Sequence, residues 1–315
     1  MKKAQGVAQG VMDSSEPLPA DLEKLLAVPD QCFRANLTSS NVGKLDVRFA
    51  PVAGKTRLIH HSHVGPLYIL QPIYTDPGFP EQVFLYTIQL GDGMVQGDRY
   101  FQNFVCEAGS AVHITSQSAS KIFRMQADLA SQRITLHLHD HAFVEYLPDP
   151  VIPFRDSRYY QRITLTIAPT ATLILGEILL PGRVAHGERH VYTLYHADLE
   201  ARRPDGSLLF ADRIHLTPQQ MPPQSPGRLG KYDVLGSLYV VTQQIAAREL
   251  VQRLRTRLAA HPDTLVGVSE LPNACGVFVR ILGFSSLPVK EAGHLAWNEV
   301  RLALRGMPAP DLRKG

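Results

Sequence analysis

The chain has 315 residues, 44% of them hydrophobic and 19% charged, and its 32 basic and 29 acidic side chains leave a net charge of +3. This composition excludes an intrinsically disordered chain, which would be poorer in apolar residues and richer in unbalanced charge, and it indicates a globular protein with a large core. Because the excess charge is small and no run of five Lys or Arg is present, we do not expect nucleic acid as a partner.

The first segment, residues 1–35, is mixed and polar, and we expect it to be an extension that precedes a single domain of residues 36–315. Prolines surround one short helical candidate at 20–27. No apolar signal-peptide core is present, and no stretch approaches the ~18 uninterrupted apolar residues of a membrane span. The three cysteines show no CxxC spacing, which argues against a disulfide framework and a structural zinc site. We therefore expect a cytoplasmic protein without a membrane partner.

From residue 45 to residue 216, short apolar or alternating runs rich in β-branched and aromatic residues predict strands. No helical pattern lies between them, so a parallel βαβ architecture is not expected. The turn Pro204-Asp205-Gly206 is typical of a hairpin, which makes its two strands antiparallel. The predicted strands are 45–49, 56–61, 67–70, 83–90, 100–106, 111–116, 133–138, 142–147, 161–167, 172–180, 191–201 and 207–216.

The last third of the chain predicts two helices. Apolar residues recur at three to five positions from Ser237 to residue 258, which indicates an amphipathic helix capped by that serine. Residues 265–268 and 277–282 predict strands, and a second helix is expected over 289–305, where Gly306 follows. Together, the elements predict one mainly β domain of many short, mostly antiparallel strands, followed by two late helices.

A glycine-rich segment, residues 91–98, follows a predicted strand as a phosphate-binding loop would. A phosphate loop leads into a helix N-terminus, whereas residues 99–106 predict another strand. A turn between strands is therefore the better interpretation. Asp98 ends this turn and could present its carboxylate to a cavity.

Two groups of histidines invite a metal-site interpretation. His137, His139 and His141 alternate with leucines, so a strand would place their imidazoles together, but on the solvated face. A metal site would need their nitrogens near 2.1 Å from a shared ion. The second group, within residues 60–63, flanks a predicted loop and is an equally weak candidate for a metal site.

Carboxylates inside apolar strands are stronger candidates. Glu145 lies in Ala-Phe-Val-Glu-Tyr-Leu and Glu177 lies in Leu-Ile-Leu-Gly-Glu-Ile-Leu-Leu, and a buried Glu is rare unless it is paired, hydrated or bound to a metal. Arg183 and Glu188 follow within Gly-Arg-Val-Ala-His-Gly-Glu. A structural ion pair, for instance between Glu177 and Arg183, is an equally good interpretation on the residues alone.

These motifs together, in this order, resemble the UreD (UreH) family of urease accessory proteins. Each motif alone is weak, whereas their order and spacing make the combination specific. Mild departures, such as Tyr146 beside Glu145, leave the candidate residues in place, and the C-terminal tail departs from the family pattern as well. The segments that carry the resemblance are 65–69, 91–98, 115–124, 145–150, 176–178, 182–188 and 276–283, and it covers roughly residues 36–310.

The resemblance implies a β-rich, helically stacked fold and a role in nickel insertion into urease that is not catalytic. It implies UreF as the direct partner, UreG recruited through UreF, and the urease apoprotein as the client. No cofactor would be bound permanently, because Ni²⁺ would pass transiently along a water-filled path. Oxygen ligands suit such a path, since His or Cys would hold Ni²⁺ too tightly. The candidates for the path are Glu177, Asp98, Glu145 and Glu188, with Arg183, Lys121 and Gln117 as residues that orient them.

Two other functions stay open. A stand-alone β-rich hydrolase would use Glu145 and Glu177 as acid and base, and turnover by the purified chain would support it. A histidine-based nickel-binding protein would use the groups around His60 and His137, and tight stoichiometric metal binding that is lost on His→Ala changes would favour it.

Overall fold

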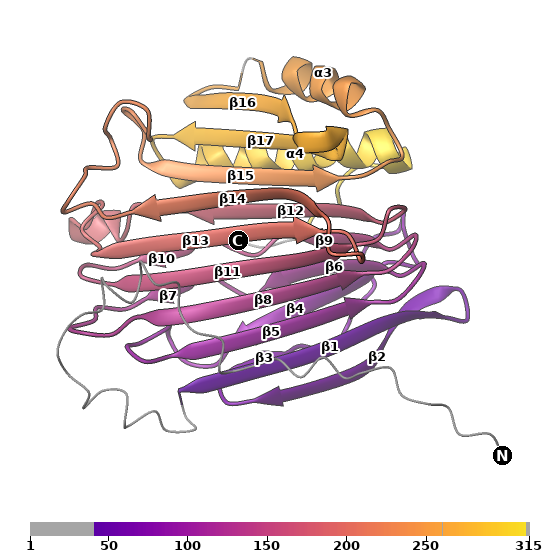
Figure 1. The fold of residues 1–315 in the computed structure, drawn as a ribbon, viewed down its shortest axis with the longest axis horizontal. Helices are drawn as coiled ribbons and strands as arrows, with labels where there is room; N and C mark the ends of the chain where they lie inside the picture. The colour runs from indigo at the N-terminus through magenta and orange to yellow at the C-terminus, as the bar shows by residue number, and fades with distance from the viewer. Residues whose placement is uncertain (1–40, 260, 313–315) are drawn as a thin grey trace.

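The computed structural model describes residues 41–259 and 261–312, which form two facing β-sheets with two helices late in the chain (Figure 1). The seven-stranded sheet A contains β1 (Val42–Val52), β2 (Lys55–Val64), β5 (Arg99–Cys106), β8 (Ala130–Leu138), β11 (Arg158–Ile167), β13 (Leu194–Arg202) and β14 (Leu208–Leu216). The ten-stranded sheet B contains β3 (Leu67–Ile69), β4 (Val83–Gln89), β6 (Ala111–Ser116), β7 (Ser120–Ile122), β9 (Phe143–Tyr146), β10 (Val151–Pro153), β12 (Thr172–Leu179), β15 (Val234–Val241), β16 (Thr264–Glu270) and β17 (Gly276–Gly283). The helices are α3 (Ala247–Leu258) and α4 (Ser286–Arg305), with short 3-10 helices at Val184–His186 and Pro272–Ala274.

In its central part the chain coils by changing sheet after nearly every strand. Sheet A therefore holds β1, β5, β8, β11 and β13 as parallel neighbours, and sheet B holds β4, β6, β9 and β12 in the same way. The mainly β class, the stacked arrangement and the two late helices are confirmed. The prediction of mostly antiparallel pairing is wrong for these coils, because each strand returns to its sheet in the same direction after one full turn. Antiparallel pairs occur toward the ends of the coil, as in β1–β2 and β15–β17.

The main core lies between the sheets. Because side chains alternate along a strand, Leu173, Leu175 and Leu179 of β12 face sheet A, whereas Ile174 and Ile178 face α4. The predicted hairpin at 204–206 is confirmed, since it joins β13 to the antiparallel β14.

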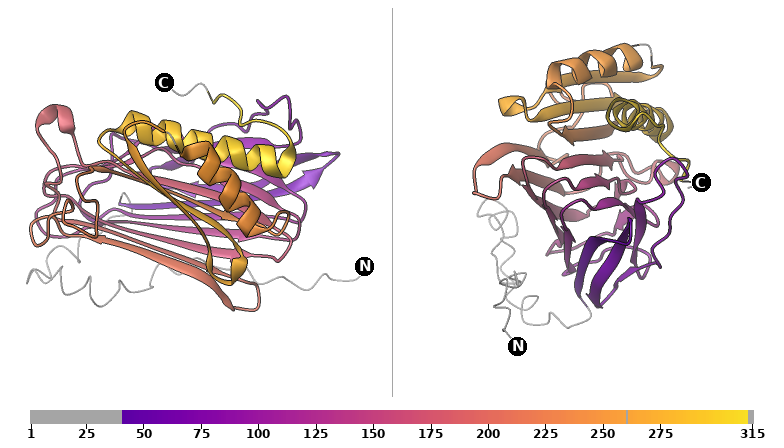
Figure 2. Two further views of the ribbon diagram at one scale, coloured as in Figure 1. Left: turned by 90° about the horizontal axis from the view of Figure 1, so that it is seen from above. Right: turned by 90° about the vertical axis from the view of Figure 1, so that its right-hand side faces the viewer.

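A second core forms where α3 and α4 cover the outer face of sheet B near the C-terminal end of the stack (Figure 2). Glycines allow the close approach of α4, because a Cβ at Gly236 would lie 2.8 Å from Val289 Cγ1 and one at Gly283 would lie 2.5 Å from Val289 Cγ2. The predicted second helix is confirmed and begins at Ser286, while Gly306 closes it with a φ of 69°.

The first predicted helix is wrong in its first part. Residues 234–241 form β15, and α3 begins only at Ala247. Every residue of β15 is buried, so both faces of the strand are apolar or small and show none of the alternation that distinguishes a strand from a helix. Leu250, Leu254 and Leu258 are buried in α3 as predicted.

The stack ends on one side with β2, an edge strand of sheet A whose side chains are mostly exposed. Within residues 41–259 and 261–312, no helix is long and apolar enough to cross a membrane. The helical candidate at 20–27 lies outside the described residues.

Candidate functional site

A cavity of about 230 Å³ lies between the two sheets, and we call it the inner cavity. Most of its lining is polar. Gln117 and Lys121, both predicted as orienting residues, contribute to the wall. The two sheets add further polar side chains to the wall, among them Gln89, Tyr100, Gln102, Gln132 and Tyr146, and Asp92 of the glycine-rich turn also lines it.

A chain of polar side chains leads from the inner cavity to Glu177. Gln132 and Gln161 stand side by side in the register of β8 and β11. The Tyr159 hydroxyl donates to Gln132 Oε1 at 2.9 Å and lies 3.2 Å from Gln161 Oε1. The Gln161 amide then donates to Glu177 Oε1. We call these four residues, Gln132, Tyr159, Gln161 and Glu177, the interior polar line.

Glu177 points between the sheets, on the same face of β12 as Leu175 and Leu179. Burial raises the pKa of Glu177 to about 7, and the Asp212 charge adds to this, while the Gln161 hydrogen bond opposes it. Glu177 is therefore poised to take up and release a proton near neutral pH.

Beyond Glu177 lies an ion pair between Arg280 and Asp212. Arg280 donates to Asp212 Oδ2 at 2.8 Å and to Ser237 Oγ at 2.7 Å. Asp212 comes from β14 in sheet A and Arg280 from β17 in sheet B, so the pair joins the two sheets.

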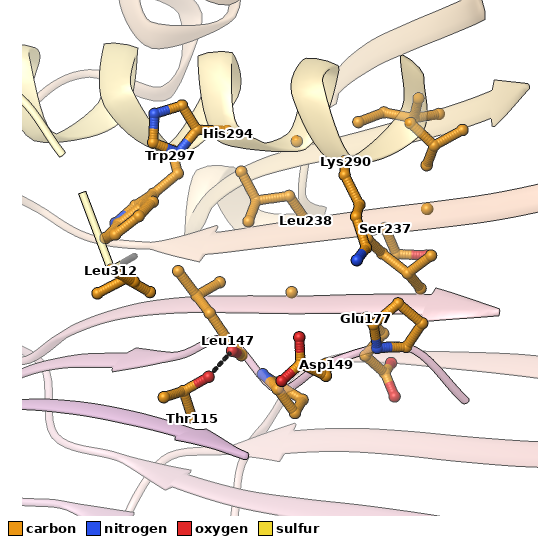
Figure 3. Close-up of a pocket in the computed structure, with 18 residues that line it drawn as sticks. Thr115, Leu147, Asp149, Glu177, Ser237, Leu238, Lys290, His294, Trp297 and Leu312 are labelled. Carbon is orange, nitrogen blue, oxygen red and sulfur yellow. Dashed lines mark hydrogen bonds between the residues drawn. The ribbon is translucent and has the colours of Figure 1, made fainter. Parts of the chain in front are cut away.

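A second cavity, of about 240 Å³, lies between α4 and sheet B (Figure 3). Its walls are mostly apolar, and Lys290 extends from α4 toward the strands, where Asp149 lies. A third, neighbouring cavity shares Asp149 and Lys290 with this pocket and shares Gln117 with the inner cavity. The three cavities are thus adjacent and follow one another from the edge of α4 to the space between the sheets.

Glu145 belongs to a different environment. Its side chain is fully buried on the α4 side of sheet B, where it accepts hydrogen bonds from Gln82 Nε2 at 3.0 Å and Trp297 Nε1 at 2.8 Å. His113 Nδ1 lies 2.9 Å from Glu145 Oε2, and Arg301 donates to both carboxylate oxygens at 3.1 and 3.2 Å. Burial alone would raise the pKa of Glu145, but these donors hold it below its usual range. The structure thus places Glu145 in a buried cluster of hydrogen-bond donors under α4, away from the inner cavity. We call this cluster, formed by Glu145 with Gln82, His113, Trp297 and Arg301, the Glu145 clamp.

Asp98 does not line the inner cavity, but it contacts Tyr100, which does. Its carboxylate accepts from the Val95 N–H at 2.8 Å, from Asn41 Nδ2 at 3.2 Å and from the Tyr100 hydroxyl at 3.1 Å, and Tyr100 lines the cavity. Burial raises the pKa of Asp98. The carboxylate therefore fixes the turn and the cavity wall, and it does not line the cavity itself.

Glu188 and Arg183 pair with each other in the loop after β12. Arg183 Nε donates to Glu188 Oε2 at 2.8 Å, and this hydrogen bond lowers the pKa of Glu188. The suggested pair between Glu177 and Arg183 is not formed, since the partner of Glu177 is Gln161. Of the predicted residues, the structure thus brings Gln117 and Lys121 together at the inner cavity, connects Glu177 to it, and separates Glu145, Glu188 and Arg183 from it.

Comparisons with known proteins identify the family. Residues 41–314 match the family model described as UreD urease accessory protein. The chain belongs to the UreD family. It is 42% identical over 295 residues to urease accessory protein UreD 2 of Streptomyces griseus, which covers 92% of this chain and 99% of that protein. It is 34% identical over 272 residues to UreD of Haloarcula marismortui, across 86% of this chain and 90% of that protein.

The histidines of this UreD-family chain are not gathered into a site. Strand β8 ends at Leu138, so of the group His137, His139 and His141 only His137 lies in the strand, while His141 sits in a turn with a φ of 59°. In the part of the chain that the structure describes, no three His, Cys, Asp or Glu side chains converge on a position that could hold a metal ion.

Reasoning from the sequence missed Gln132, Tyr159 and Gln161 of this UreD-family chain. A signal was present, because Gln132 and Gln161 stand at inward positions of two strands whose later inward residues are all Ile or Leu. A glutamine was passed over because it carries no charge, although an inward amide also needs a hydrogen-bonding partner.

Proposed function

We propose that this chain is a maturation factor that guides Ni²⁺ toward apo-urease through the space between its two sheets. The observation that carries the proposal is the interior polar line, which continues the polar inner cavity as far as Glu177. Amide and phenol oxygens with a single carboxylate are weak, hard ligands, so hydrated Ni²⁺ can exchange water for them and still leave.

Glu177 supplies the one carboxylate of the interior polar line. Because its pKa is raised to about 7, the carboxyl group can exchange a proton for the metal near neutral pH. Lys121 stands at the inner cavity and Arg280 beyond Glu177, so a positive side chain lies at each side of the line. These cations disfavour a tightly held metal, and this supports transit.

The role we propose involves no catalysis. Glu145 and Glu177 are the acid and base that a hydrolase would need, yet they project from opposite faces of sheet B, toward α4 and toward sheet A respectively. A single substrate could not reach both, which argues against the hydrolase. We further propose UreF as direct partner, UreG recruited through UreF, and the urease apoprotein as client, all in the cytoplasm.

Reconstitution of apo-urease activation tests the proposal. The purified wild-type chain, Glu177→Ala and Gln161→Leu are each combined with apo-urease, the other accessory proteins and nickel, and the nickel content and activity of urease are measured. We expect Glu177→Ala to lower both strongly and Gln161→Leu to lower them partly. Glu249→Ala, which changes an exposed glutamate in the first turn of α3, is the control and should activate as the wild type does. Normal urease loading by a folded Glu177→Ala would refute the path.

A further inference from the structure

The two sheets do not end together at the C-terminal side of the stack. Sheet A ends at β14, whereas sheet B continues past it with β15, β17 and β16 (Figure 1). Gly267 of β16 stands beside Arg280 of β17 in the antiparallel register, and it is exposed, as are Leu265 and Ser269 on the same face. We call the place where Arg280 meets Asp212 of β14 the seam.

A row of polar side chains in sheet B leads from Glu177 to the seam. Glu177 of β12 stands beside Ser237 of β15, and Ser237 stands beside Arg280 of β17. Residues that are paired in register share a face of the sheet, so these three side chains lie in one row. Ser237 Oγ accepts a hydrogen bond from Arg280 Nη1 at 2.7 Å, and Arg280 Nη2 donates to Asp212 Oδ2 at 2.8 Å. The row therefore extends the interior polar line as far as the seam.

Burial decreases along this row. Ser237 is 6% exposed, whereas the side chains of Arg280 and Asp212 are 27% and 29% exposed. At the other end of the line, Gln117 and Lys121 line the inner cavity and are exposed. The interior polar line thus lies between two places that water reaches. Because water also reaches both charges at the seam, their ion pair is weaker than a fully buried one.

Each partner of this ion pair keeps another contact when the pair opens. Asp212 Oδ2 also accepts a hydrogen bond from the Tyr239 hydroxyl. The Arg280 guanidinium lies 4.7 Å from the ring centroid of Phe278, and it is bonded to Ser237 as well. An ion pair is costly to open when a charge is left in the interior without a partner. At the seam neither charge would be left in that state.

Open space for such a movement lies beside Arg280. Gly267 is the neighbour of Arg280 on β16, and a Cβ at Gly267 would meet no atom of the described chain within 4 Å. The φ of Gly267 is not positive, so the backbone there does not require a glycine. The absence of a side chain at this position leaves room for the guanidinium to turn away from Asp212 toward β16.

We propose that the ion pair of Arg280 with Asp212 is a gate, through which Ni²⁺ leaves the interior polar line at the seam when Arg280 turns toward Gly267. The inference rests on the proposed function, because it takes Ni²⁺ as the cargo of the line. A divalent cation and the guanidinium compete for the same carboxylate, so an arriving ion displaces Arg280 from Asp212. The returning guanidinium then displaces the ion, which favours its release to the client.

Nickel loading of apo-urease by the full chain, with the other accessory proteins present, tests the gate. Gly267→Leu fills the space beside Arg280 and should lower the initial loading rate at least about fivefold, because the guanidinium can no longer turn aside. Arg280→Ala removes that side chain, so the double variant should load faster than Gly267→Leu alone. Ser269→Leu is the matched control, since it adds the same side chain to the same face of β16 beside Phe278, and it should load as the wild type does. Circular dichroism and urea unfolding verify that each variant folds.

The outcomes separate the gate from the path. If a folded Gly267→Leu loads urease at the wild-type rate while Glu177→Ala is defective, the gate is wrong and the path stands without it. Normal loading by Glu177→Ala refutes the path itself, and the inference fails with it. If Gly267→Leu is slow but Arg280→Ala brings no relief, or if Ser269→Leu is equally slow, the added side chains cover a docking face and the gate is again wrong. Slow loading that Arg280→Ala relieves supports the gate.

Discussion

Removal of the Arg301 side chain should be among the most damaging single changes in the molecule. Arg301 comes from α4 and is fully buried, and it donates to both oxygens of Glu145 and to the carboxylate of Asp76. Arg301→Met keeps a similar volume but leaves two buried carboxylates without their cation. Breaking a buried pair in this way costs about 3–5 kcal/mol of unfolding free energy. Because Trp297 and Gln82 still donate to Glu145, we expect a value near the lower end of that range.

An exposed ion pair on the same helical layer gives the matched comparison. Arg253 of α3 donates to Glu299 of α4 at 2.9 Å, but its side chain is 42% exposed. Exposed pairs contribute at most about 1 kcal/mol, so Arg253→Met should change the unfolding free energy far less than Arg301→Met does.

Urea unfolding followed by circular dichroism and by tryptophan fluorescence measures both variants. Trp297 is the single tryptophan of the chain and donates to Glu145, so its fluorescence reports directly on the clamp. A depressed pKa also means that the contribution of Glu145 is present above its ordinary value of 4.5 and is lost as the pH falls through its lower value in the folded state. If Arg301→Met costs less than about 1 kcal/mol, or no more than Arg253→Met, the buried cluster does not hold α4 and the reasoning is wrong.

Further changes test other parts of the structure. The pKa of Glu177 is raised from 4.5 to about 7, so the folded state loses stability as the pH rises through that interval. Glu177→Gln should therefore raise the melting temperature at pH 8 but not at pH 5. Equal melting temperatures of the variant and the wild type at pH 8 would contradict the burial of this charge. Gly276→Ala should prevent correct folding, because its Cβ would lie 1.8 Å from the Val240 carbonyl oxygen, and a soluble variant with the wild-type circular dichroism spectrum would disprove this. Gly293→Ala meets open space within α4 and should raise the unfolding free energy in urea by about 0.5–1 kcal/mol, whereas a loss would show that the site is closed.

The sequence pattern was sufficient for elements whose signal is local. The hairpin at 204–206 and the helix ended by Gly306 depend on neighbouring residues alone, and both were predicted. The direction of pairing was not accessible in this way, because a short apolar run fits a parallel or an antiparallel neighbour equally well. It is set by the coil, which brings β8 between β5 and β11.

The candidate site shows the same limit. Glu145 and Glu177 are both carboxylates within apolar strands, and nothing near them in the sequence separates their roles. Their partners do so, because Arg301 reaches Glu145 from 156 positions away, whereas Glu177 meets Gln161 on the opposite sheet. Contacts at such separations are fixed only when the whole stack has formed.

Within the part of the chain that the structure describes, β2 is an edge strand with no further strand beside it, and this has a consequence for how copies of this protein behave at high concentration. Sheet A ends with β2 on one side and β14 on the other, so addition of one chain's β2 to another chain's β14 would repeat without closing and produce a filament. Two features of β2 oppose such polymerisation. The pairing with β1 shifts register between Arg48 and Phe49, which distorts the edge, and Lys55 and Arg57 place charge along it. A coiled β-protein can thus keep an open end and stay a discrete particle, provided that its last strand is irregular and charged.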